Sequence, residues 1–263
     1  MYLEQKIFTQ VHLNRPAVIL LHAFPVNHHM WEPQMNFLTA QGIPYLTLDY
    51  PGFGDSSPFA EPPAMADFAA VVVATIKETK IPRAVFIGLS MGGYVALAVY
   101  RQAPELFAGL VLADTRATAD SPEGKQRRFQ LMQQIEQTGD LQPLIESHVE
   151  KFFTIRSRKN KLLVSRARRF MERATTIGVR HALHAMAHRP DSTELLSQMD
   201  FPVEVIVGED DQLTTVDDAA AMVEQLPRGH LTIIPQAAHL TNMEQPQAFN
   251  AALASYFKRI GIF

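Results

Sequence analysis

The stretch FIGLSMGGYVAL, residues 86–97, places a serine between two glycines, where one apolar run ends and the next begins. Gly88, Ser90 and Gly92 fit the G-x-S-x-G pattern, which exposes its serine at a sharp bend between a strand and a helix. Glycine leaves room for such a bend, and the helix after it directs backbone N–H groups toward Ser90. Two interpretations are open here: a nucleophile held up for attack, or a packing turn that contains a serine.

Composition narrows the class of protein. The 263 residues are 47% hydrophobic and 19% charged with a formal net charge of −3, which is typical of globular proteins and gives no reason to expect a nucleic-acid partner. The absence of cysteine excludes disulfides and thiol chemistry. The N-terminus lacks the pattern of a signal peptide, and no apolar run approaches the ~20 residues that span a bilayer. We therefore expect a cytoplasmic protein with no membrane contact.

Short apolar runs alternate with helical patterns along the chain. Most of these runs are apolar throughout, which is typical of strands buried on both faces of a parallel sheet. Between two of them, one face of a helical pattern carries Phe68, Val71, Val72, Thr75 and Ile76. We therefore predict an α/β fold with a mostly parallel central sheet flanked by helices. The predicted strands lie within 17–24, 44–50, 83–90, 108–114, 203–210 and 230–237.

Residues 116–189 interrupt this alternation, because they show helical patterns and no convincing strand. The segment carries fifteen lysines and arginines against seven acids, whereas the rest of the chain is acidic. We predict that residues 1–115 and 190–263 form the core, and that 116–189 form a helical cap inserted before the last strands. The alternative is that the basic side chains only solvate exposed helix faces.

A serine hydroxyl is a weak nucleophile until a base removes its proton. His239 follows the last predicted strand, at the sheet edge where Ser90 also lies. Glu209, Asp210 and Asp211 end another predicted strand at that edge. An acid from this group would fix the tautomer of His239 and stabilise its protonated form. The order serine, acid, histidine along the chain is that of the serine α/β hydrolases.

The sequence resembles the α/β-hydrolase-fold serine hydrolases over nearly its whole length. LLHAFPVNHHMW (20–31) resembles the family's H-G-F/W-P stretch, and LDYPGFGDSS (48–57) resembles its D-x-x-G-x-G-x-S loop. GEDDQLTT (208–215) resembles the family's acid loop, and AAHLTNMEQP (237–246) resembles its histidine loop. Segments on either side of the predicted cap resemble the 3-oxoadipate enol-lactonase and carboxylesterase branch of the family.

The resemblance implies roles for individual residues. Ser90 would be the nucleophile, His239 the general base and Asp211 the acid. Asp114, at the end of the strand before the cap, is the alternative acid. The oxyanion hole would consist of the backbone N–H groups of Phe24 and Met91.

Two positions depart from the family's pattern. Ala23 replaces the usual glycine, and its β-carbon would narrow the approach to the oxyanion hole while leaving the Phe24 N–H intact. Thr215 replaces the usual proline of the acid loop, which loosens a turn without removing a catalytic group.

A serine, a base and an oxyanion hole together perform acyl transfer. The resemblance therefore implies a serine hydrolase that cleaves a small carboxylic ester or lactone through an acyl-enzyme on Ser90, with no cofactor. Three alternatives stay open: a cofactor-free perhydrolase, a hydrolase of carbon–carbon bonds, and a ligand receptor that retains the triad. A homodimer formed through the cap is compatible with the sequence.

We place His22, Trp31 and Arg116 in the substrate pocket, with packing anchor as the alternative role of Trp31. Arg116 lies at the junction of core and cap, where a guanidinium would bind a carboxylate-bearing substrate. Further arginines crowd the cap at positions 156, 158, 166, 168, 169 and 173. A metal site is not expected, although His181, His184 and His188 share a helix face.

Overall fold

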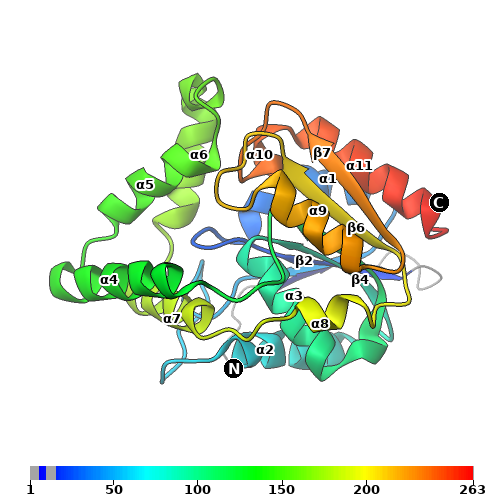
Figure 1. Cartoon of the computed structure of the whole chain (residues 1–263), viewed down its shortest axis with the longest axis horizontal. Coiled ribbons are helices and arrows are strands. Elements are labelled where there is room, and N and C mark those ends of the chain that lie inside the picture. Colours follow the sequence, from blue (N-terminus) through cyan, green and yellow to red (C-terminus); the bar gives the residue numbers. More distant parts are fainter. Residues whose placement is uncertain (1–5, 10–15, 263) are drawn as a thin grey trace.

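The described residues, 6–9 and 16–262 of this computed structural model, contain seven strands that form one sheet (Figure 1). The strand order is β1-β3-β2-β4-β5-β6-β7, and each neighbouring pair is parallel except β1 and β3. The predicted α/β fold with a mostly parallel central sheet is confirmed. The strands are β1 (Lys6–Thr9), β2 (Ala17–Leu21), β3 (Tyr45–Leu48), β4 (Ala84–Leu89), β5 (Phe107–Ala113), β6 (Val203–Gly208) and β7 (Gly229–Ile234).

The central strands are buried on both faces, which explains their continuous apolar sequence. All residues of β2, β4 and β6 are buried, whereas β7 at the edge is partly exposed. The sequence analysis did not predict β1. This strand has four residues and pairs with β3 alone at the other edge, so it leaves no long apolar run to detect.

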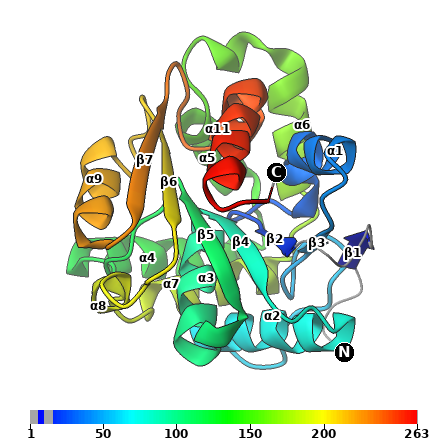
Figure 2. The same cartoon turned by 90° about the vertical axis from the view of Figure 1, so that its right-hand side faces the viewer.

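Helices cover both faces of the sheet. Figure 2 shows α2 (Met65–Thr79) and α3 (Met91–Gln102) on one face and α1 (Glu32–Ala40) and α11 (Pro246–Arg259) on the other. Four of the five residues predicted for the inner face of α2 are buried, and Val71 is half-buried against the core. The remaining helices of the core are α8 (Thr193–Leu196), α9 (Val216–Gln225) and α10 (Thr241–Glu244).

Of the α-helices between β5 and β6, the first four lie to one side of the sheet, at the left of Figure 1. Helix α4 packs against α7, and α5 packs against α6, so the group consists of two helix pairs. The group falls within the predicted range 116–189, and we refer to it as the cap, while the exact domain limits stay a prediction. The cap helices are α4 (Pro122–Thr138), α5 (Gln142–Phe152), α6 (Lys161–Met171) and α7 (Thr176–Ala187).

Ion pairs and a backbone hydrogen bond join the cap to the core. Arg166 on α6 lies 2.5 Å from Glu32 on α1, and Arg173 forms an ion pair with Asp55. The Thr175 N–H at the start of α7 donates to the Gly52 carbonyl at 2.9 Å. Among the helices of the described chain, none combines the length and the apolar content needed to cross a membrane.

Candidate active site

Ser90 lies at the bend between β4 and α3. Its backbone has φ 55° and ψ −115°, a conformation that costs a non-glycine residue about 1–3 kcal/mol. Two hydrogen bonds hold the bend: the Ser90 N–H donates to the Ala113 carbonyl at 2.9 Å, and the Thr115 hydroxyl donates to the Ser90 carbonyl at 2.8 Å. A β-carbon on Gly92 would collide with the Leu21 carbonyl, so only glycine lets α3 start this close to β2.

The His239 imidazole joins Ser90 to Asp211. Its Nε2 lies 2.8 Å from the Ser90 Oγ, and its Nδ1 lies 2.8 Å from the Asp211 Oδ2. The three side chains follow β4, β6 and β7, whose carboxyl ends meet at one edge of the sheet. The structure therefore brings together the serine, acid and histidine that the sequence analysis selected.

The surroundings of Asp211 favour its ionised form. Burial by itself would raise the pKa of Asp211, but the adjacent His239 imidazole and several hydrogen bonds outweigh burial and hold the pKa below its usual value. The donors are His239, the Thr214 hydroxyl at 2.5 Å and the Leu213 N–H at 2.8 Å. An ionised acid on Nδ1 leaves the His239 Nε2 available to take a proton from Ser90.

Asp114, the alternative acid, binds two other groups instead of His239. Its Oδ1 accepts the Gly208 N–H at 2.9 Å, and its Oδ2 is hydrogen-bonded to the Thr241 hydroxyl. Complete burial and the nearby Asp211 charge raise the pKa of Asp114 well above its usual value. Asp114 therefore connects the last residue of β6 to the first residue of α10, and the structure favours Asp211 as the partner of His239.

The loop that carries His239 is attached to the cap by Glu244. One Glu244 oxygen accepts the Thr154 N–H at 2.9 Å and the Thr154 hydroxyl at 2.6 Å, and the other accepts the Ala238 N–H at 2.8 Å. The Leu240 N–H also donates to the Phe152 carbonyl, at the end of α5. The Phe152 ring stacks on the His239 imidazole with 5.8 Å between centroids.

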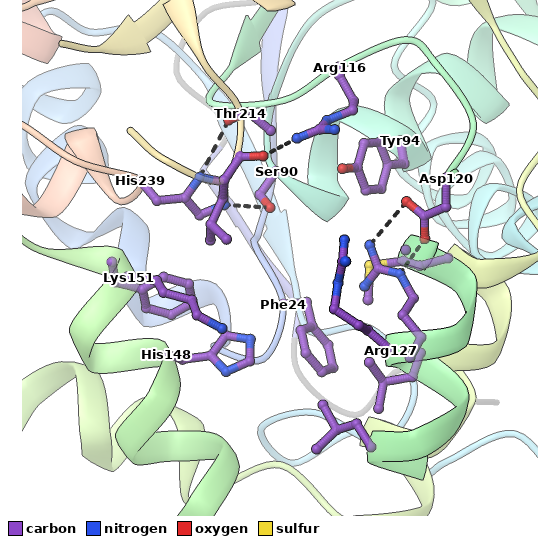
Figure 3. Close-up of a pocket in the computed structure, with 17 residues that line it drawn as sticks. Phe24, Ser90, Tyr94, Arg116, Asp120, Arg127, His148, Lys151, Thr214 and His239 are labelled. Carbon is purple, nitrogen blue, oxygen red and sulfur yellow. Dashed lines mark hydrogen bonds and ion pairs between the residues drawn. The ribbon is translucent and has the colours of Figure 1, made fainter. Parts of the chain in front are cut away.

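A cavity of about 270 Å³ is lined by Ser90 and His239 from the core and by residues of α4, α5 and α7 from the cap (Figure 3). Part of its lining is apolar, from Phe24, Phe152, Leu183 and others. The rest is charged or polar. The charged lining residues are Arg116, Asp120, Arg127, Arg128 and Lys151.

A sequence model of the alpha/beta hydrolase family matches residues 18–252. The chain belongs to the α/β hydrolase family. It is 28% identical over 247 residues to 3-oxoadipate enol-lactonase 2 of Acinetobacter baylyi, covering 94% of this chain and 90% of the relative. A pimeloyl-(acyl-carrier protein) methyl ester esterase of Neisseria meningitidis is 27% identical over 251 residues, and the match covers 92% of this chain and 94% of that relative.

Solved structures agree with this family. A thermophilic esterase from Thermogutta terrifontis, solved with malate bound, superposes with a TM-score of 0.92 at 30% identity, covering 97% of this chain and 93% of that one. The enol-lactonase from Burkholderia xenovorans shares the fold at a TM-score of 0.88 and 21% identity, and the match covers 97% of this chain and 96% of that one. The resemblance found in the sequence is therefore confirmed.

Two of the three predicted pocket residues do not line the cavity of this α/β hydrolase. Trp31 is fully buried and packs against Phe249 with 6.1 Å between ring centroids, so it has the alternative role of packing anchor. His22 is also fully buried: its Nδ1 donates to the Ala23 carbonyl at 2.8 Å, and its Nε2 accepts the Tyr50 N–H at 3.1 Å. Burial lowers the pKa of His22 to about 4, so the ring stays neutral and acts as a structural bridge.

Arg116 does line the cavity, but the six cap arginines named from the sequence do not. Outward-facing acids pair with several of them: Arg166 pairs with Glu32 and Arg168 with Glu146. The cations that the cap contributes to the cavity are instead Arg127, Arg128 and Lys151. Sequence alone did not indicate these three residues, because α4 and α5 carry polar side chains on more than one face.

His148 on α5 also lines the cavity and was not predicted from the sequence. Its Nδ1 donates to the Leu144 carbonyl at 2.8 Å, and its ring packs edge-on against Phe24 with 5.6 Å between centroids. Burial lowers the pKa of His148 to about 4, so the imidazole is neutral. His148 lines the cavity (Figure 3), and its Nε2 carries no proton and can accept a hydrogen bond.

The two departures from the family pattern have structural explanations. Ala23 is fully buried and does not line the cavity, so the predicted narrowing by its β-carbon is wrong for this cavity. Thr215 caps α9: its hydroxyl accepts the Asp218 N–H at 3.2 Å, which replaces the rigidity of a proline. Phe24 lines the cavity and Met91 is the first residue of α3, while the oxyanion role of their N–H groups stays a prediction.

Two of the three cap histidines, His184 and His188, are hydrogen-bonded to backbone carbonyls. His188 Nδ1 donates to the His184 carbonyl at 2.9 Å, and His184 Nδ1 donates to the Pro63 carbonyl at 3.2 Å. Within residues 6–9 and 16–262, no group of three or more histidine, cysteine, aspartate or glutamate side chains is arranged to hold a metal ion.

Proposed function

We propose that this α/β hydrolase cleaves small carboxylic esters or lactones through an acyl-enzyme on Ser90. The observation that carries the proposal is the hydrogen-bonded chain from the Ser90 Oγ through the His239 imidazole to the Asp211 carboxylate, with 2.8 Å at each step. The cavity beside Ser90 gives this chain access to a small substrate.

The first half of the reaction forms the acyl-enzyme. The Ser90 Oγ attacks the ester carbonyl carbon as the His239 Nε2 takes the hydroxyl proton, and Asp211 stabilises the imidazolium. The carbonyl oxygen becomes an oxyanion that the backbone N–H groups of Phe24 and Met91 stabilise. The bond to the leaving oxygen then breaks, and that oxygen receives the proton from His239.

The second half releases the acid. Water replaces the alcohol, gives a proton to the His239 Nε2 and attacks the acyl carbon, and the Ser90 oxygen leaves with that proton. With a lactone the alcohol and the acid are two ends of one product. The printed names of the relatives, an enol-lactonase and a methyl ester esterase, support both substrate classes.

Hydrolysis of 4-nitrophenyl esters of increasing acyl length tests the proposal. The wild type is expected to turn over short esters repeatedly, with a decline once the chain exceeds a cavity of about 270 Å³. Ser90→Ala should lower kcat by at least about 10³-fold. Ser165→Ala makes the same chemical change on α6, which contributes no residue to the cavity lining, and should leave the rate unchanged.

Two outcomes contradict the proposal. Equal rates for the wild type and Ser90→Ala would remove Ser90 from the chemistry. A single burst of nitrophenol followed by no turnover would indicate a ligand receptor that is acylated once.

A further inference from the structure

A second cavity adjoins the cavity beside Ser90. It has a volume of about 100 Å³, and its lining is mainly apolar and comes from α2, α3 and the segment between α7 and α8. Leu97 and Ala117 in this lining are buried, whereas Ala66 and Gln102 are exposed. The second cavity therefore runs inward from the surface toward the core.

Tyr94 and Arg116 line both cavities, so they form the partition between them. Tyr94 lies on α3, one turn after Ser90, and its N–H donates to the Ser90 carbonyl at 3.3 Å. Figure 3 shows Tyr94 on the side of the pocket opposite His148 and Lys151. The partition therefore ends the cavity beside Ser90 within about one helical turn of the proposed nucleophile.

Contacts with Arg189, which also lines the second cavity, hold the Tyr94 ring in place. The Arg189 guanidinium carbon lies 4.0 Å from the ring centroid. Arg189 is buried and donates to Asp120 at 2.7 Å, to the Met186 carbonyl at 2.9 Å and to the Thr118 carbonyl at 2.8 Å. A guanidinium with three acceptors is held in one position, and the ring that stacks on it is held with it. Tyr94 is therefore a fixed wall of the cavity beside Ser90.

Arg116, the other half of the partition, is anchored to the loop that carries the acid. Its guanidinium donates to the Leu213 carbonyl and lies 3.5 Å from an Asp218 oxygen. The Leu213 N–H in turn donates to Asp211 at 2.8 Å. Substitution of Arg116 would therefore disturb the acid as well as the partition, which makes Tyr94 the better residue for altering the partition.

We propose that Tyr94 determines the longest substrate chain that fits the site, because its ring separates the cavity beside Ser90 from an apolar cavity suited to extend it. The inference rests on the proposed function, and it assigns the limit on substrate length to one residue. An apolar cavity of about 150 Å³ can hold benzene, so about 100 Å³ corresponds to about four carbon atoms. Removal of the ring should therefore admit chains that are at least about four carbons longer.

Two series of esters test the inference. The 4-nitrophenyl esters from acetate to decanoate vary the acyl chain, and the alkyl butyrates from ethyl to octyl vary the alcohol. In one series, Tyr94→Ala should raise kcat/KM for the long members relative to the shortest one by at least about tenfold, because each buried methylene strengthens binding about fourfold. The series that gains identifies the half of the substrate that faces Tyr94.

Further variants assign the gain to the second cavity. Tyr94→Phe keeps the ring and should keep the wild-type length limit. Ala98→Leu extends a side chain into the second cavity and should by itself leave the length limit unchanged. Combined with Tyr94→Ala it should cancel the gain, because the added carbon atoms occupy most of about 100 Å³. Tyr94→Leu removes less of the ring and should shift the limit in the same direction, so it replaces the alanine variant if that variant does not fold.

The inference is overturned if a folded Tyr94→Ala or Tyr94→Leu variant keeps the wild-type limit in both series, or if Ala98→Leu leaves the gain in place. Either result leaves the proposed function intact as long as short esters are hydrolysed and Ser90→Ala abolishes that hydrolysis. The proposed function fails separately if Ser90→Ala hydrolyses the short esters as fast as the wild type does.

Discussion

Two substitutions of Asp114, to alanine and to asparagine, distinguish how its hydrogen bonds and its ionisation each contribute to the unfolding free energy. Asp114→Ala leaves the buried Gly208 N–H and Thr241 hydroxyl without their partner. Each lost buried partner costs about 1–3 kcal/mol, and Thr241 falls at the low end because its hydroxyl can rotate. Alanine at the observed φ of 43° adds about 1 kcal/mol. The sum is about 4 kcal/mol, which corresponds to a fall in Tm of about 8–16 °C.

Asp114→Asn should be tolerated, because an amide oxygen can accept the Gly208 N–H while its NH₂ donates to the Thr241 hydroxyl. Its effect depends on pH. The raised pKa of Asp114 means that the folded protein keeps this proton at pH values where the unfolded chain has lost it. Above about pH 4 the unfolding free energy of the wild type therefore falls relative to that of Asp114→Asn, until the pH passes the folded-state pKa.

Thermal and urea unfolding of the wild type and both variants at pH 5 and pH 8 measures these differences. The alanine variant should be the least stable at both values, and the asparagine variant should gain on the wild type between them. Equal losses for alanine and asparagine, or a wild-type-to-asparagine difference that is constant with pH, would show that Asp114 is ionised in the folded protein.

Trp31→Ala should lower the unfolding free energy by about 3–5 kcal/mol, because it empties a fully buried site against Phe249. Trp31→Phe should lower the unfolding free energy by less than half as much, because it also removes a buried indole N–H that has no partner. Urea unfolding measures both losses. A changed preference for ester length in the phenylalanine variant would contradict the position of Trp31 outside the cavity. Folding lowers the pKa of Asp211, so its ionised carboxylate stabilises the folded protein above about pH 4. This contribution to the unfolding free energy is lost as the pH falls through the pKa of Asp211 in the folded protein. Asp211→Asn should therefore flatten the decline in stability between pH 5 and pH 2, and parallel declines in the two proteins would refute this.

The convergence of Ser90, Asp211 and His239 could be predicted because it depends on local sequence and on one property of parallel sheets. Each residue follows a continuous apolar run, and the carboxyl ends of parallel strands share an edge. Gly92 also indicated the bend, because the close packing of α3 against β2 excludes a β-carbon at that position. The acid was harder to select, because Asp114 also follows a buried strand at that edge.

The lining of the cavity could not be predicted, because it depends on how the cap packs against the core. Arg127 and Arg166 both lie on polar cap helices, and only long-range contacts such as the pair of Arg166 with Glu32 decide which helix face is turned outward. His22 and Trp31 flank Phe24 in the sequence, but their partners come from distant segments that no local pattern indicates.

The attachment of the His239 loop to the end of α5 has a consequence for how substrate enters. Three hydrogen bonds, two from Thr154 to Glu244 and one from Leu240 to Phe152, join that end of the cap to the segment that carries His239. Swinging α5 away would break all three, at about 1 kcal/mol each, and would displace the imidazole from Ser90. Any rearrangement of the cap that keeps the His239–Ser90 contact must therefore leave these three bonds, and the end of α5, in place.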